Sequence, residues 1–132
     1  MVIVMFFCCF KPYRVSSTND YKLKPGISGH IYVVKEREFI KTKENIYKIG
    51  KSTCIKNRMP SYPKDSSILI IIQTGSYDVH DIEKQFIRNM DKLFIKRTDI
   101  GTEYYECEQG EIMGECMLLL NSIHRLRYES RQ

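Results

Sequence analysis

The chain has 132 residues, of which 42% are hydrophobic and 28% charged, as expected for one soluble globular domain, and it contains no low-complexity segment. Its net charge of +5 is unevenly divided. Residues 1–64 carry 13 Lys and Arg against 4 Asp and Glu (net +9), whereas residues 65–132 carry 8 against 12 (net −4). The basic half predicts a surface for a polyanion, and the acidic half a metal ion or a cationic partner; the alternative is an unevenly charged solvated surface.

The cysteines argue against both a zinc site and a disulfide scaffold. There are five, an odd number, and none has Cys-x-x-Cys spacing: Cys8, Cys9, Cys54, Cys107 and Cys116. Such a set favours buried free thiols in a reducing, intracellular compartment.

The first ten residues, Met1–Phe10, are almost entirely apolar. They have no basic flank or cleavage site typical of a signal peptide, and they are too short for a transmembrane helix. We expect a buried strand or an apolar tail docked on the domain, with a homodimer or protein-partner contact as the alternative. Residues 1–28 are therefore predicted to be a tail and linker, and residues 29–128 the folded domain.

Hydrophobic periodicity and turn residues predict seven elements after this linker. In chain order they are strands at 31–34 and 46–49 joined by a charged loop, a short helix at 53–62, a strand at 67–74, a helix at 78–94, a strand at 103–107 and a helix at 110–128. The unbroken isoleucine-rich run in 67–74 predicts a strand buried on both faces rather than an edge strand.

Four polar side chains are spread over about half of the chain: Tyr32 and Tyr47 on the first two predicted strands, Arg58 on the short helix and Glu83 near the start of the longer helix. Hydroxyl groups, a permanently charged cation and a carboxylate are the groups that a one-metal phosphodiesterase needs. The same residues could equally be ordinary members of a small α/β core.

The motifs around these residues resemble the GIY-YIG nuclease superfamily, and more closely the divergent GIY-YIG-like domains of large DNA viruses and phages. The matching pieces are Gly29-His30-Ile31-Tyr32, Tyr47-Lys48-Ile49-Gly50, Arg58, Tyr62-Pro63-Lys64-Asp65-Ser66, Glu83 and Asp99-Ile100-Gly101-Thr102-Glu103-Tyr104-Tyr105-Glu106. The resemblance implies an α/β fold with a small three-stranded, mostly antiparallel sheet flanked by helices. It also implies cleavage of nucleic acid, DNA in the first place, with one Mg²⁺ or Mn²⁺ ion. A viral origin would place the protein in the host cytoplasm or nucleus.

The resemblance assigns the metal to Glu83 and the scissile phosphate to Arg58. No Lys or Arg lies one helical turn from Glu83 to pair with it. The alternatives are a first-turn helix acid and a surface arginine. Tyr62 stands near the position where family members often have a histidine, and a phenol could replace that base only if its pKa were lowered or the proton went to metal-bound hydroxide.

The resemblance implies that Tyr32, together with Tyr47 or Lys48, would position or deprotonate the attacking water. When Ile49-Gly50 is aligned with the end of the family motif, Lys48 occupies the tyrosine position and Tyr47 is one residue early. A one-residue shift along a strand reverses the face, so we expect Lys48 in the site and Tyr47 in the core. Further contacts to the nucleic-acid backbone are expected from lysines at three positions, Lys51, Lys56 and Lys64.

These observations predict a metal-dependent endonuclease. The register change at Lys48 and the missing histidine leave a second interpretation open, in which a catalytically degenerate module on the same fold binds nucleic acid or a host protein.

Overall fold

A five-stranded antiparallel sheet forms the centre of the protein, in a computed structural model that describes residues 21–129, with side chains through Arg125. In spatial order the strands are β3 (Ser67–Gln73), β1 (His30–Lys35), β2 (Ile46–Ser52), β5 (Tyr104–Glu106) and β4 (Ile95–Lys96). The α/β class with an antiparallel sheet and flanking helices is confirmed. The sheet has five strands rather than three, because the short pair β5–β4 extends it beyond β2.

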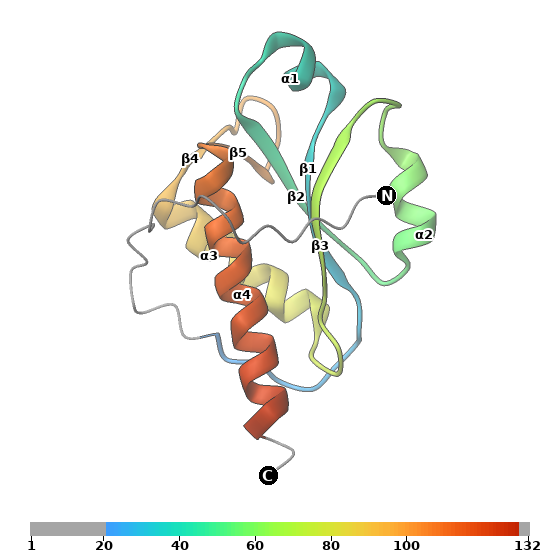
Figure 1. Cartoon of the computed structure of the whole chain (residues 1–132), viewed down its shortest axis with the longest axis vertical. Helices are drawn as coiled ribbons and strands as arrows, with labels where there is room; N and C mark the ends of the chain where they lie inside the picture. The colour runs from blue at the N-terminus through green and yellow to red at the C-terminus, as the bar shows by residue number, and fades with distance from the viewer. Residues whose placement is uncertain (1–20, 130–132) are drawn as a thin grey trace.

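Two long helices cover one face of this sheet. They are α3 (Val79–Leu93) and α4 (Gln109–Glu129), and their apolar side chains join those of the strands in the hydrophobic core. The shorter helices are α1 (Arg37–Thr42), α2 (Ile55–Arg58) and the single 3-10 turn η1 (Met59–Ser61). Figure 1 shows α2 on the opposite side of β3 from α3 and α4. The sheet therefore lies between two unequal layers.

Alternation along β1 and β2 divides their side chains between the two layers. Ile31 lies opposite Lys51, and Val33 opposite Ile49, on the face that packs against α3 and α4. Tyr32 lies opposite Gly50, and Val34 opposite Lys48, so these residues belong to the other face, called here the α2 face.

The segment between β1 and β2, and the place of β3 in the sheet, also differ from the sequence prediction. The charged loop predicted at 35–45 contains α1, which ends at Lys43 in the left-handed conformation; its six residues bury no side chain, so no hydrophobic periodicity marked it. β3 is an edge strand of the sheet, not a strand buried on both faces. Its isoleucines are explained by packing against α4 on one side and by partial cover on the other.

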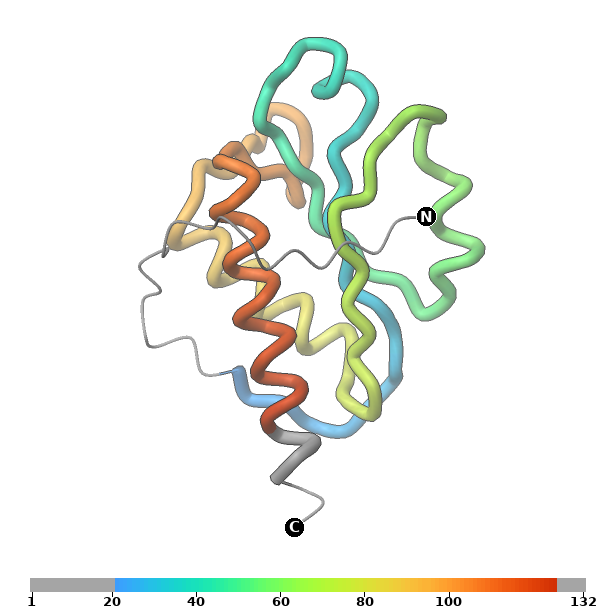
Figure 2. Tube along the Cα trace, viewed as in Figure 1, coloured from blue at the N-terminus to red at the C-terminus, as the bar shows by residue number. Residues whose placement is uncertain are grey.

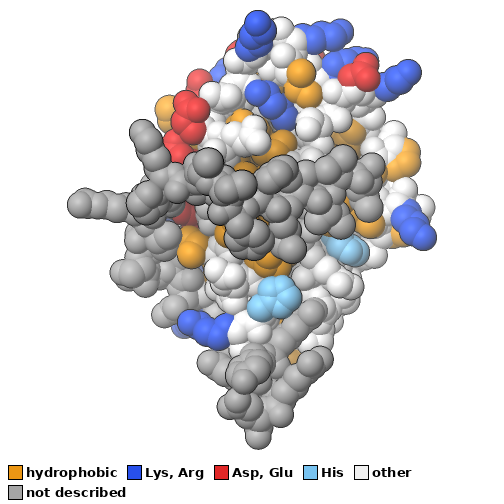
Figure 3. Space-filling model, in the orientation of Figure 1, with side chains coloured by type: hydrophobic (Ala, Val, Ile, Leu, Met, Phe, Trp, Pro, Cys, Tyr) orange, Lys and Arg blue, Asp and Glu red, His pale blue; other side chains and the backbone are white. Residues whose placement is uncertain are grey.

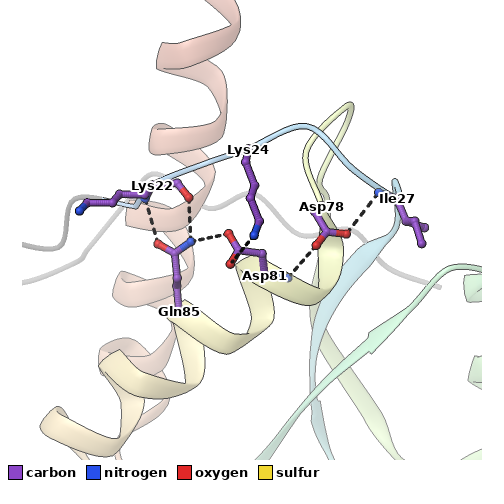
Figure 4. A network of polar contacts seen from close by, with 6 residues as sticks. All are labelled: Lys22, Lys24, Ile27, Asp78, Asp81 and Gln85. Carbon is purple, nitrogen blue, oxygen red and sulfur yellow. Dashed lines mark hydrogen bonds and ion pairs between the residues drawn. The ribbon is translucent and has the colours of Figure 1, made fainter.

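Residues 21–28, predicted as linker, are attached to α3. Figure 2 shows this segment in blue as it curves below the sheet into β1, and Tyr21 is buried in the core. The Gln85 side chain bonds both the backbone N–H and the carbonyl of Lys22, at 2.9 and 2.8 Å, and Asp78 caps α3 while accepting from the Ile27 N–H (Figure 4). The expectations for Met1–Phe10 fall outside the described residues. Within residues 21–129, no helix has the length and apolarity that crossing a bilayer requires.

Candidate functional site

Tyr32, Arg58 and Tyr62 meet on the α2 face of the sheet. The Tyr32 hydroxyl lies 2.9 Å from the Tyr62 hydroxyl and accepts a hydrogen bond from Arg58 Nε at 3.0 Å. The two rings meet edge to face with centroids 5.9 Å apart. Three of the side chains singled out in the sequence, from β1, α2 and the segment after η1, therefore form one hydrogen-bonded cluster.

Gly50 lies directly against the Tyr32 ring of this cluster. It lies directly opposite Tyr32 in the β1–β2 register, and a Cβ atom added to it would stand only 2.6 Å from Tyr32 Cε2. The absence of a side chain at this position lets the Tyr32 ring pack directly against β2, fully buried. The glycine that ends the Tyr-Lys-Ile-Gly motif thus has a packing reason to be glycine.

Lys48 belongs to the same face, and Tyr47 does not. The Lys48 ammonium lies 5.4 Å from the centroid of the Tyr62 ring and 5.5 Å from that of Tyr104. Tyr47 is 1% exposed and packs in the core, where burial raises the pKa of its hydroxyl to about 12. Strand alternation therefore places these neighbours as expected.

The environment of Tyr62 does not favour a general base. Burial raises the pKa of its hydroxyl, and the hydrogen bond with Tyr32 raises that pKa further, while the neighbouring Arg58 guanidinium lowers it by less. The hydrogen bond to Tyr32 in turn raises the pKa of Arg58, which stays a cation. A phenol with a raised pKa retains its proton at neutral pH, so Tyr62 suits a donor or positioning role rather than replacement of a histidine base.

Glu83 lies on the other side of β2, in the second turn of α3. Its Oε1 atom accepts from Lys51 Nζ at 3.1 Å, with the two side chains 12% and 36% exposed. Lys51 was predicted to contact the nucleic-acid backbone; in the structure it neutralises the candidate metal ligand. The contacts of the described residues therefore form two groups, one around Tyr32 and one around Glu83.

The two groups contact β2 at neighbouring positions near the end of this strand, from opposite faces of the sheet. This strand pairs with β5 from Ile46 to Lys48, with one more backbone bond from the Ile49 N–H to Glu103. Within residues 21–129 no strand continues the pairing on that edge along Gly50–Ser52. Lys51, which pairs with Glu83, and Gly50, which contacts Tyr32, are consecutive residues of β2 and therefore belong to opposite faces of the sheet.

The second oxygen of Glu83 is the candidate metal ligand. Oε2 is buried and has no hydrogen-bond partner among the described residues, although a buried carboxylate oxygen normally accepts a hydrogen bond or binds a cation. In the part of the chain that the structure describes, no group of three His, Cys, Asp or Glu side chains gathers. A site with one carboxylate suits Mg²⁺ or Mn²⁺, since these ions retain water and take substrate oxygens as ligands.

Lys56 and Lys64 are exposed, on α2 and just after Tyr62 respectively, so both flank the Tyr32 cluster. Two contributors to this face were not predicted as site residues. Tyr104 contacts Lys48, and Phe39 of α1 meets the Tyr104 ring edge to face at 6.3 Å. The Asp-Ile-Gly-x-Glu-Tyr motif could have indicated Tyr104 as a site residue, because Tyr104 is part of it. Nothing in the local sequence indicated such a role for Phe39.

Comparison with protein families gives one match, to the T5orf172 domain over residues 29–118. No significant match was found among curated proteins or among solved structures. The matched region starts at the first residue of the Gly-His-Ile-Tyr motif and extends into α4. It contains every candidate site residue described above. The chain therefore belongs to the T5orf172 domain family.

Proposed function

We propose that this domain is a metal-dependent endonuclease that hydrolyses phosphodiester bonds in nucleic acid, with DNA as the first substrate to test. The observation that carries the proposal is the buried Glu83 carboxylate, one oxygen of which has no hydrogen-bond partner among the described residues, next to the strand that supports the Tyr32–Tyr62–Arg58 cluster. Membership of the T5orf172 family and the resemblance to GIY-YIG nucleases support the same activity.

The residues divide into a metal side and a phosphate side. Glu83 would hold one Mg²⁺ or Mn²⁺ ion, which when bound supplies Lewis-acid stabilisation of the phosphate and a more acidic water. Arg58 would bind the scissile phosphate, because its guanidinium is exposed, stays charged and is aimed by its bond to Tyr32. Tyr32, held by both Arg58 and Tyr62, would orient the attacking water.

A second candidate is a nucleic-acid-binding module that does not cut. Two observations favour it: Lys51 already neutralises Glu83, and Tyr32 is fully buried beneath its partners. In this case the α2 face would hold a phosphate backbone without hydrolysing it.

Plasmid nicking with Mg²⁺ or Mn²⁺ separates the two candidates. The test variants are Glu83→Gln and Arg58→Met, which preserve side-chain size and remove the charge. The matched controls are Glu38→Gln and Arg88→Met, because these residues are exposed and lie outside both groups. We expect metal-dependent nicking that falls at least about a hundredfold in both test variants and is unchanged in both controls. Absence of nicking by the wild type, with DNA binding retained, would refute the nuclease and support the binding module.

A further inference from the structure

A row of aromatic side chains extends from the candidate site along the α2 face. It consists of Tyr62, Tyr104 and Phe39, and is called here the aromatic row. Lys48 lies between the first two rings, 5.4 and 5.5 Å from their centroids, and the Tyr104 and Phe39 centroids are 6.3 Å apart. The residues come from β2, β5, α1 and the segment after η1, so the fold, not local sequence, assembles the row.

The row differs from the aromatic residues of the core. All three rings are only partly buried, and none belongs to the core that α3 and α4 form with the sheet. Tyr105, the next residue along β5, is by contrast completely buried. Partly exposed rings on a sheet face offer flat apolar surface to a ligand.

Tyr104 is held in a defined position. The Arg97 backbone N–H donates to the Tyr104 carbonyl at 2.8 Å, and the Arg97 side chain forms two bonds to Asp99, at 2.9 and 2.8 Å. Gly101 lies so close that an added Cβ would be 2.9 Å from Tyr104 Cε2. A ring positioned in advance loses little conformational entropy when a ligand stacks on it.

The charges around the row are divided. Arg58, Lys56 and Lys64 are exposed cations at the Tyr62 end. At the other end α1 carries further basic residues, and Figure 3 shows Lys and Arg side chains gathered over that part of the molecule. Tyr104 has carboxylates beside it: after burial, the neighbouring Glu36 is the main cause that raises the pKa of its hydroxyl. A phosphate would thus be favoured at the ends of the row, and an uncharged base at its middle.

We propose that the aromatic row is a stacking surface for the unpaired bases of a single-stranded nucleic acid, whose phosphates lie at the two ends of the row, along Arg58 and the basic residues of α1. Every base has a face that stacks on an aromatic ring, whereas the bases of a duplex are already stacked on each other. The inference rests on the proposed function, because it uses the same face, and it specifies the substrate: a single strand, or a junction with unpaired nucleotides.

Binding measured without metal tests this inference independently of cutting. The probes are fluorescein-labelled oligo-dT, oligo-U and a DNA duplex of the same length, followed by fluorescence anisotropy at low salt in EDTA. The protein carries Glu83→Gln, so hydrolysis does not interfere. The test variants are Tyr104→Leu and Phe39→Leu, which keep apolar bulk but remove the ring. Tyr77→Leu is the matched control, since Tyr77 is a partly buried tyrosine that packs against the core.

We expect tighter binding of both single strands than of the duplex, and about tenfold weaker single-strand binding for Tyr104→Leu, with a smaller loss for Phe39→Leu. Thermal melting of each variant identifies any that fails to fold, and Phe39→Leu on the exposed helix α1 provides a second test. Equal or tighter duplex binding, no binding of any probe, or a loss no larger than in Tyr77→Leu would overturn the inference. If the wild type nicks DNA but one of these results is found, the proposed nuclease stands and the stacking surface is refuted. If single strands bind as expected but the wild type does not nick, the stacking surface stands and the nuclease is refuted.

Discussion

Replacing Gly50 by alanine tests whether the contact between Tyr32 and β2 organises the candidate site. A methyl group at this position would lie 2.6 Å from Tyr32 Cε2, closer than carbon atoms can approach. The Tyr32 ring is fully buried and its hydroxyl is bonded to Arg58 and Tyr62. The ring therefore cannot move away without breaking those bonds or moving β1 relative to β2.

Overpacking of this kind costs about 1–3 kcal/mol of unfolding free energy. For a domain of this size, each 1 kcal/mol lowers the melting temperature by about 4 °C, so we expect Gly50→Ala to melt about 4–12 °C below the wild type. If nicking is observed in the wild type, the displaced Tyr32 hydroxyl should also reduce it.

Thermal unfolding followed by circular dichroism measures this effect, with Gly110→Ala as the matched control. An added Cβ at Gly110, in the first turn of α4, meets no atom of residues 21–125 within 4 Å. The control should melt at the wild-type temperature or slightly above it, since alanine favours a helix over glycine. The double variant Gly50→Ala/Tyr32→Leu should recover part of the loss, because the smaller side chain relieves the clash. A Gly50→Ala protein as stable as the wild type would refute the packing argument.

Two further predictions concern the ion pair and the thiols. Lys51→Met should lower the unfolding free energy by about 1 kcal/mol, less than the loss of a fully buried pair, because Lys51 is partly exposed. Mn²⁺ should raise the melting temperature of Lys51→Met more than that of the wild type. It should not raise the melting temperature of Glu83→Gln. Burial raises the pKa of Cys107 to about 12, so brief iodoacetamide treatment near neutral pH, mapped by peptide mass, should modify exposed Cys54 well before Cys107. A thiol in the unfolded chain has a pKa of about 8.5. The stability that the neutral Cys107 thiol contributes is therefore complete below that pH and falls as the pH rises towards 12. Equal alkylation of Cys54 and Cys107 in the folded protein would contradict this reasoning.

The sequence predicts local features of this fold better than contacts between distant elements. Period-2 alternation was sufficient to place Lys48 and Tyr47 on opposite faces of β2, because that property depends on the strand alone. The pairing of Lys51 with Glu83 was missed, since a search along the helix for a partner cannot detect a lysine on a strand. The edge position of β3 was missed because an apolar run does not record which strands lie beside it.

The attachment of residues 21–28 to α3 affects how this domain can be transplanted between proteins. The family match begins at Gly29, yet Tyr21 fills part of the core, and the backbone of Lys22 and Ile27 bonds Gln85 and Asp78. A fusion that starts at Gly29 would leave a hole in the core and two polar side chains of α3 without their partners. A portable form of the domain therefore has to include residues 21–28.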